Sequence, residues 1–207
     1  MPSDGRTLVI AATDAVIFLD TVTGETTRTL KKPAHIVTLS SDGKWLGTSR
    51  HHYRSVLRTA ERGEAATRFE FGTKVIFSPD ARWMALSTGG EVRVHKMELP
   101  LQTAYPLIQL GGETAYNPPL EFSPDSRMFA VPFNRMQVRL YETSTGRVLA
   151  TLTPSHPAPI MGGSALEFTA DGQWLLAAKN DGETVSWHLP VIRAELAKQG
   201  LNWTDPE

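Results

Sequence analysis

The densest cluster of polar side chains in the sequence is Arg50-His51-His52-Tyr53-Arg54. Guanidinium, imidazole and phenol groups in one short segment suit contact with a partner protein or a phosphate, because guanidinium groups donate several hydrogen bonds in a fixed geometry. We therefore take this segment as a candidate partner-binding loop. The alternative interpretation is a solvated loop, since loops accumulate polar residues that have no binding role.

The same segment does not predict a metal site, because no carboxylate or third histidine stands at ligand spacing from His51 and His52. The sequence has no cysteine, which excludes disulfides, thiolate chemistry and cysteine-based zinc sites. It also has no G-x-S-x-G or H-E-x-x-H motif, and its glycine pairs lack the lysine of a phosphate-binding loop. We predict a protein without catalytic residues, metal or cofactor.

Four aspartates recur at a regular spacing and could suggest a carboxylate centre. They lie 38, 45 and 46 residues apart, in phrases such as FSPDARWMALST and FSPDSRMFAVPF: Asp42, Asp80, Asp125 and Asp171. Each phrase has an apolar segment, a turn and a second apolar segment, and proline followed by aspartate is typical of a tight turn. The aspartates are therefore predicted to form turns, one per repeat, and not to act together.

A repeat of about 40 residues with four short strands is the unit of a β-propeller. We predict an all-β fold, a propeller-like array of four-stranded antiparallel blades with a short C-terminal helix. Three blades are full, and the first and last have three strands each. The predicted blades span residues 6–30, 35–71, 73–110, 120–152 and 166–189.

Residues 190–207 are predicted to form a capping helix and a tail. The segment PVIRAELAKQ begins with proline, is followed by Gly200 and places Val191, Ile192 and Leu196 on an apolar face. Such a helix would cover an exposed sheet edge or the base of the propeller. The alternative is a helix that docks into a partner protein.

Composition and charge restrict the partners. The chain has 21 basic and 22 acidic residues, a net charge of -1 and no long run of like charge, so neither nucleic acid nor an anionic membrane is expected to bind. No apolar run approaches the ~20 residues of a membrane span. The polar start MPSDGRT does not resemble a secretory signal, which predicts a cytoplasmic protein.

The strand order, the FSPD turns and the segment TSTGRVLATL resemble the WD-repeat β-propeller family, from about Arg6 to Leu189. The family's Trp-Asp pair at the end of the third strand appears as Leu19-Asp20, Tyr141-Glu142 and Trp187-His188, so the repeats are degenerate. The ending WHLPVIRAELAKQGLNW is also similar to the tails of bacterial WD-repeat proteins, some of which are joined to serine/threonine kinase domains.

The resemblance implies two features of the candidate site. In that family a His, a Ser or Thr, an Asp and a Trp of one blade form a buried hydrogen-bond network, and His156, Asp181 and Trp187 match three of these. The hydroxyl is not matched, because the second strand WLLAAK offers alanines. Loops between second and third strands form the binding face, which would bring Arg54, Arg135 and Asp181 towards one ligand.

These observations predict a non-catalytic protein–protein interaction scaffold of the WD-repeat type. A second hypothesis is the C-terminal regulatory or sensor segment of a bacterial signalling protein such as a serine/threonine kinase. A third is a propeller hydrolase or lactonase, which needs a metal and clustered acids on the propeller axis. A seven-bladed ring needs roughly 290 residues, so we also expect self-association through open sheet edges or completion by a missing upstream segment.

Overall fold

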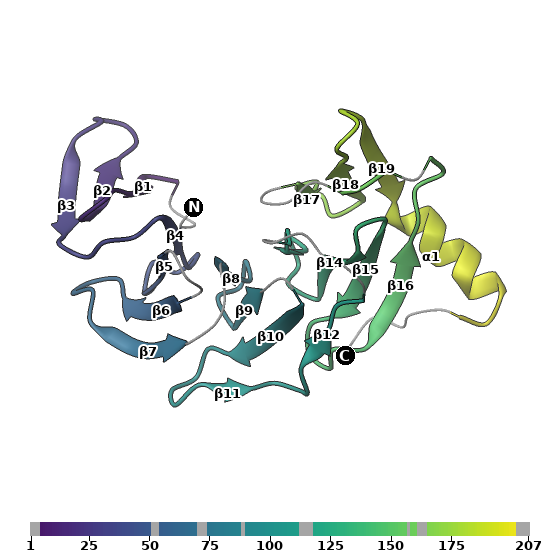
Figure 1. Ribbon diagram of the computed structural model, residues 1–207, viewed down its shortest axis with the longest axis horizontal. Coiled ribbons are helices and arrows are strands. Elements are labelled where there is room, and N and C mark those ends of the chain that lie inside the picture. The colour runs from purple at the N-terminus through teal and green to yellow at the C-terminus, as the bar shows by residue number, and fades with distance from the viewer. Residues whose placement is uncertain are drawn as a thin grey trace. The chain divides into compact units, whose positions relative to one another are not determined.

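The computed structural model describes residues 5–50, 54–69, 74–87, 90–111, 118–156, 158–160 and 165–201. Its regular structure is five antiparallel sheets and one short helix, which confirms the predicted all-β array (Figure 1). The chain divides into two compact units, and their boundaries fall within the third sheet. The first unit is Met1–Thr88 with Val92–Thr103, and the second is Gly89–Glu91 with Ala104–Glu207.

The first unit carries three sheets whose strands follow one another in sequence. The first sheet is β1 (Thr7–Ala11), β2 (Val16–Asp20) and β3 (Thr26–Leu30). The second is β4 (Ile36–Leu39), β5 (Trp45–Arg50), β6 (Arg54–Thr59) and β7 (Ala65–Phe69). The third contains β8 (Lys74–Phe77), β9 (Trp83–Ser87), β10 (Glu91–Lys96) and β11 (Gln102–Thr103).

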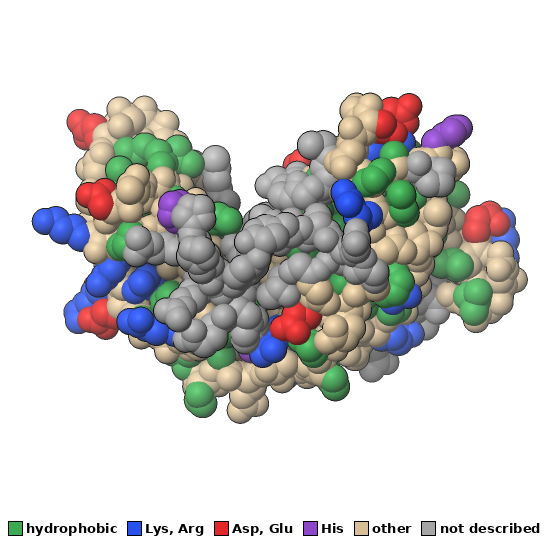
Figure 2. All heavy atoms as spheres, in the orientation of Figure 1, with side chains coloured by type: hydrophobic (Ala, Val, Ile, Leu, Met, Phe, Trp, Pro, Cys, Tyr) green, Lys and Arg blue, Asp and Glu red, His purple; other side chains and the backbone are tan. Residues whose placement is uncertain are grey.

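The first sheet shows how alternation along a strand builds the core. Val16 and Phe18 on β2 are buried in a cluster with Leu46 of β5, whereas the side chains between them face the other way. On that opposite face the register pairs Leu8 with Leu19, and Ile10 with Ile17. Leu8 is 38% and Ile10 39% exposed, and Figure 2 shows hydrophobic side chains gathered over β1 and β2. One face of this sheet is therefore apolar and accessible.

The second unit carries the last two sheets and the helix. Its strands are β12 (Ile108–Gln109), β13 (Glu121–Phe122), β14 (Met128–Asn134), β15 (Gln137–Glu142), β16 (Val148–Leu152), β17 (Leu166–Phe168), β18 (Trp174–Ala178) and β19 (Thr184–His188). β13 to β16 form one sheet in sequence order, and β17 to β19 form the other. Buried side chains of both sheets, including Val138, Leu140 and Leu175, form one core cluster.

Helix α1 (Leu189–Lys198) follows β19 without a turn, and its proline lies in the first helical turn. Leu189 is buried in the core cluster of the second unit, and Ile192 and Leu196 pack against it. Of the apolar face predicted from the sequence, Ile192 and Leu196 are thus used inside the fold, whereas Val191 is 53% exposed. Among the described residues, no helix is long and apolar enough to cross a membrane.

The repeated aspartates are confirmed as turn residues. Each accepts a hydrogen bond from the Ser or Thr two residues earlier, over 2.5 to 2.6 Å. Each also accepts one from the backbone N–H two residues later, over 3.0 to 3.1 Å. The residue after the aspartate has a positive φ, and Ala81 and Ser126 adopt this conformation without being glycine. The carboxylates are therefore committed to local backbone geometry.

Candidate interaction surface

Three segments of the second unit meet beyond the ends of its strands. The turn Asn134–Gln137 and the hairpin Lys179–Glu183 are both tied to the segment that precedes β17. The backbone N–H of Ile160 donates to the Arg135 carbonyl over 2.7 Å, and that of Asn180 donates to the Pro159 carbonyl over 2.8 Å. We call the described residues of these segments, 134–137, 153–156, 158–160 and 179–183, the loop surface.

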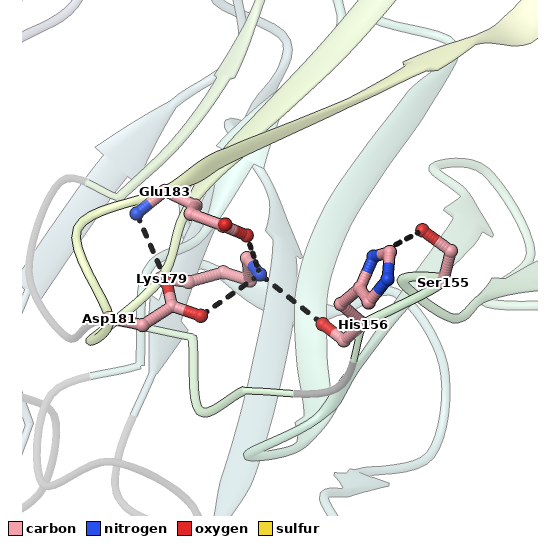
Figure 3. Close-up of polar contacts among 5 residues, drawn as sticks. All are labelled: Ser155, His156, Lys179, Asp181 and Glu183. Atoms are coloured by element: carbon pink, nitrogen blue, oxygen red, sulfur yellow. Dashed lines mark hydrogen bonds and ion pairs between the residues drawn. The ribbon is translucent and has the colours of Figure 1, made fainter.

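Lys179 is the buried centre of this surface, with a side chain only 3% exposed. Its ammonium donates to the His156 carbonyl over 3.2 Å, to Asp181 Oδ2 over 3.1 Å and to Glu183 Oε2 over 2.7 Å (Figure 3). A lysine ammonium has three donors, so all of them are used. Lys179 therefore holds the hairpin to the neighbouring segment and is not free to bind a ligand.

The charges of the cluster are mutually stabilised. The hydrogen bond that Lys179 donates to Glu183 raises the pKa of Lys179 and outweighs the opposing effect of burial. The pKa of Asp181 is lowered, first by the backbone N–H of Glu183 and further by Lys179. The two carboxylates stay partly accessible, at 41% and 67%. In the described part of the chain no third ligand joins them to form a metal-binding group.

The turn Asn134–Gln137 presents side chains outward from a fixed backbone. Asn134 Oδ1 accepts from the Met136 N–H over 2.8 Å, and its Nδ2 donates to Gln137 Oε1 over 3.0 Å. Gln137 in turn donates to Thr153 Oγ1 over 3.0 Å. Arg135 is exposed, and Met136 is 40% exposed. The turn therefore offers a cation and a thioether whose backbone positions are set in advance.

The structure brings two of the three residues of the predicted network together through Lys179. The carbonyl of His156 and the carboxylate of Asp181 share the Lys179 ammonium, while the exposed His156 ring lies 3.3 Å from Ser155 Oγ. Trp187 lies in β19, where it is half-buried and packs against the core cluster. Lys179 has no counterpart in the network implied by the sequence. The sequence feature that could have revealed this cluster is a lysine at the end of an apolar strand, followed by acidic residues two and four positions later.

Of the predicted loop Arg50–Arg54, the structure describes only the backbone of the two end residues. Arg50 and Arg54 are paired as the last residue of β5 and the first of β6, which places the loop between second and third strands, as expected. His51, His52 and Tyr53 lie outside the described residues. A partner-binding role for this loop stays a prediction.

Comparison with known proteins adds information on the fold. No protein-family model and no curated protein matches the sequence. Among solved structures, the β-propeller domain of Cps50 (Swd1) from Myceliophteria thermophila is similar to this chain, with a TM-score of 0.69 and 14% sequence identity. The chain has a β-propeller fold. The match covers 91% of this chain and 64% of that chain, so this propeller chain spans less than two thirds of its structural neighbour.

Proposed function

We propose that the chain is a non-catalytic scaffold for protein–protein interaction, of the WD-repeat type. The loop surface carries this proposal, because it presents Arg135, Met136 and His156 on segments held by hydrogen bonds around the buried Lys179. Arginine and methionine are enriched at protein interfaces. A surface ordered before binding loses less conformational entropy when a partner docks. Fold alone does not define function, so these side chains are the ground for the proposal.

A quantitative pull-down from the source organism tests it. The variant Arg135→Ala with Met136→Ala is compared with the unaltered chain, and the variant Arg50→Ala, His52→Ala, Arg54→Ala tests the predicted loop separately. Loss of about 1.4 kcal/mol of binding would lower affinity tenfold, so we expect a clear fall in recovery of a specific partner. The matched control is Lys44→Ala with Arg127→Ala, two exposed cations at aspartate turns. Unchanged recovery of every partner with both test variants would contradict the proposal.

The register of the sheets supports the WD-repeat assignment within this proposal. The first residue of each second strand pairs with the residue at the end of the third strand: Trp45 with Thr59, Trp83 with Lys96, Met128 with Glu142 and Trp174 with His188. The pairs Arg58-Thr59 and His95-Lys96 therefore occupy the position of the family's Trp-Asp pair, in addition to those recognised in the sequence. We further propose a cytoplasmic protein related to the bacterial branch of this family. A regulatory segment of a signalling protein is the alternative, favoured if a kinase is encoded upstream in the same frame.

Self-association is a further part of the proposal, and the accessible face of the first sheet supports it. The cross-strand pairs Leu8–Leu19 and Ile10–Ile17 present four aliphatic side chains on a face opposite the core. A second copy of the chain is the proposed occupant, and an upstream segment of the same protein is the alternative. Light scattering over a range of concentrations tests this, with Ile10→Lys as the disrupting variant. A monomer at every concentration would contradict self-association.

A further inference from the structure

A pocket of about 420 Å³ opens in the first unit, at the start of β9 and the end of β10. It is lined by residues of the second aspartate turn, of the start of β9, of the end of β10 and of the segment after β10: Ala81, Arg82, Trp83, Lys96, Met97 and Glu98. None of these residues belongs to the loop surface or to the Arg50–Arg54 loop. The pocket is therefore separate from the surface that supports the proposed function.

The pocket lies where the chain departs from its own repeat. After β2, β6 and β15 the turn closes by a hydrogen bond from a glycine N–H to the carbonyl four residues earlier: Gly24 to Asp20, Gly63 to Thr59 and Gly146 to Glu142. After β10 the residue at the glycine position is Pro100, which has no N–H to donate. The regular turn cannot form there.

The side chain at the start of this turn is also different. Asp20 Oδ1 accepts from the N–H groups of Val22 and Thr23, over 2.8 and 3.0 Å, and Glu142 accepts from Thr145 in its own turn. Lys96 occupies the same register position, and an ammonium group has no acceptor with which to organise a turn. The Lys96 ammonium is consequently not used to organise the turn and is available to contact a ligand.

The lining combines an aromatic surface with two cations. Lys96 Nζ lies 5.9 Å from the centroid of the Trp83 ring, within the range of a cation–π contact. Arg82 has a side chain that is 82% exposed, and its ion pair with Asp80 is long, at 4.0 Å. Exposed pairs of this kind contribute little, so the guanidinium can turn to a ligand. Met97 packs against the core beneath, and Glu98 is exposed at the rim.

We propose that this pocket binds a short acidic peptide segment of a partner protein, in which a carboxylate side chain stands beside an apolar one. The carboxylate lies between Arg82 and Lys96, and the apolar side chain lies on Trp83 and Met97. Leu99, 54% exposed beside the lining, extends the apolar contact. Glu98 disfavours a second acid at its side of the pocket, because like charges repel at short range.

The test is a titration of the full 15N-labelled chain with the acetylated, amidated tripeptide Glu-Phe-Glu, followed by NMR at the indole N–H of each tryptophan. The Trp83 resonance is assigned from a Trp83→Phe variant. We expect this resonance to shift saturably. The Trp174 resonance is the internal comparator, because Trp174 has the same repeat position but lies against His188, with ring centroids 4.5 Å apart and ring planes tilted by 42°.

Charge variants decide whether the pocket recognises the acid. The neutral peptide Gln-Phe-Gln and the double variant Arg82→Gln, Lys96→Gln should each weaken binding by about tenfold or more, as expected for charge-assisted hydrogen bonds. Glu98→Gln should strengthen binding of Glu-Phe-Glu, a gain that misfolding cannot produce. Arg127→Ala is the matched control, because Arg127 follows the turn aspartate Asp125 just as Arg82 follows Asp80, and it should leave binding unchanged.

Three results would overturn the proposal: no saturable shift at Trp83 up to millimolar peptide, equal affinity for the neutral peptide, or unchanged affinity in the double variant. Weaker binding by Glu98→Gln would also overturn it. None of these results bears on the loop surface, whose partners are tested by pull-down.

Discussion

Two buried bases, one in each unit, meet opposite surroundings. Lys179 at the loop surface is surrounded by three acceptors, and the hydrogen bond that it donates to Glu183 raises its pKa. His95 on β10 is 7% exposed, with its ring centroid 5.6 Å from that of Phe69. Neither ring nitrogen of His95 makes a hydrogen bond of good geometry to a described residue. Burial lowers the pKa of His95; the Gln102 backbone opposes this effect, and the charge of Arg93 adds to it.

The difference shows how the surroundings of a buried basic side chain decide its role in the fold. Where the chain supplies acceptors, a buried base stays charged and joins two segments. Where it supplies apolar neighbours, burial favours the neutral form of the base, and the side chain fills space in the core. The side chain after His95 lies on the opposite face of the strand, and Lys96 therefore lines the pocket. A basic residue in this repeat is a binding candidate only when its donors are not already used.

The largest expected effect is at Lys179. Lys179→Met removes the three hydrogen bonds and leaves Asp181 and Glu183 facing each other without a counter-charge. We expect a fall of several degrees in the thermal unfolding midpoint, together with faster amide exchange at Asn180 and Ile160. The triple variant Lys179→Met, Asp181→Asn, Glu183→Gln should recover part of the loss, because no unpaired charge remains. Equal stability of Lys179→Met and the unaltered chain would remove the structural role assigned to this lysine.

The pH dependence of stability should separate the contribution of Lys179 from that of Asp181. A raised pKa of Lys179 means that its contribution is complete below the ordinary value of 10.5 and is lost as the pH rises through the folded value. A lowered pKa of Asp181 means that its contribution is complete above 3.8 and is lost as the pH falls through the folded value. Denaturant unfolding across this range should therefore lose the alkaline decline in Lys179→Met. The acidic decline should persist in part, because the Glu183 N–H still holds Asp181.

The contribution of His95 to stability should change with pH in the direction opposite to that of Lys179. Because its folded pKa is lowered, stability is complete above the ordinary value of 6.5 and falls as the pH decreases from there towards the folded value. His95→Phe removes this dependence and can retain the ring contact with Phe69. We expect the variant to be the more stable protein at pH 5, with a smaller difference at pH 8, in unfolding by denaturant. A difference that does not change with pH would show that the pKa of His95 is not lowered in the folded protein.

The sequence predicted the parts of this molecule that short-range chemistry determines. The aspartate turns and the C-terminal helix depend on neighbouring residues, so their predicted positions agree with the structure within a residue or two. The propeller fold followed from their repetition at a period of about 40 residues. Local turn chemistry repeated in register was sufficient to recognise the architecture.

The candidate sites depend on contacts that a single sequence does not display. The lysine cluster requires the carbonyl of His156, 23 positions before Lys179. The pocket requires Lys96 to stand opposite Trp83, a pairing set by strand register. Matching tryptophans also differ: Trp45 packs against the core, Trp83 lines the pocket and Trp174 is 39% exposed. A signal was nevertheless present, since KMELP replaces the glycine-containing turn of the other repeats.

The smallest effect on stability should come from Lys96, and this sharpens the contrast with Lys179. Lys96→Gln keeps most of the aliphatic stem and removes only an exposed charge near Trp83, so its unfolding free energy should change by no more than about 0.5 kcal/mol. Binding of the acidic peptide should fall in the same variant, because the carboxylate loses one of its two cations. Thermal unfolding and the NMR titration on one protein sample separate these quantities. A stability loss as large as that of Lys179→Met would mean that the Lys96 ammonium stabilises the fold as Lys179 does. The pocket would then have only Arg82 as a cation for the ligand.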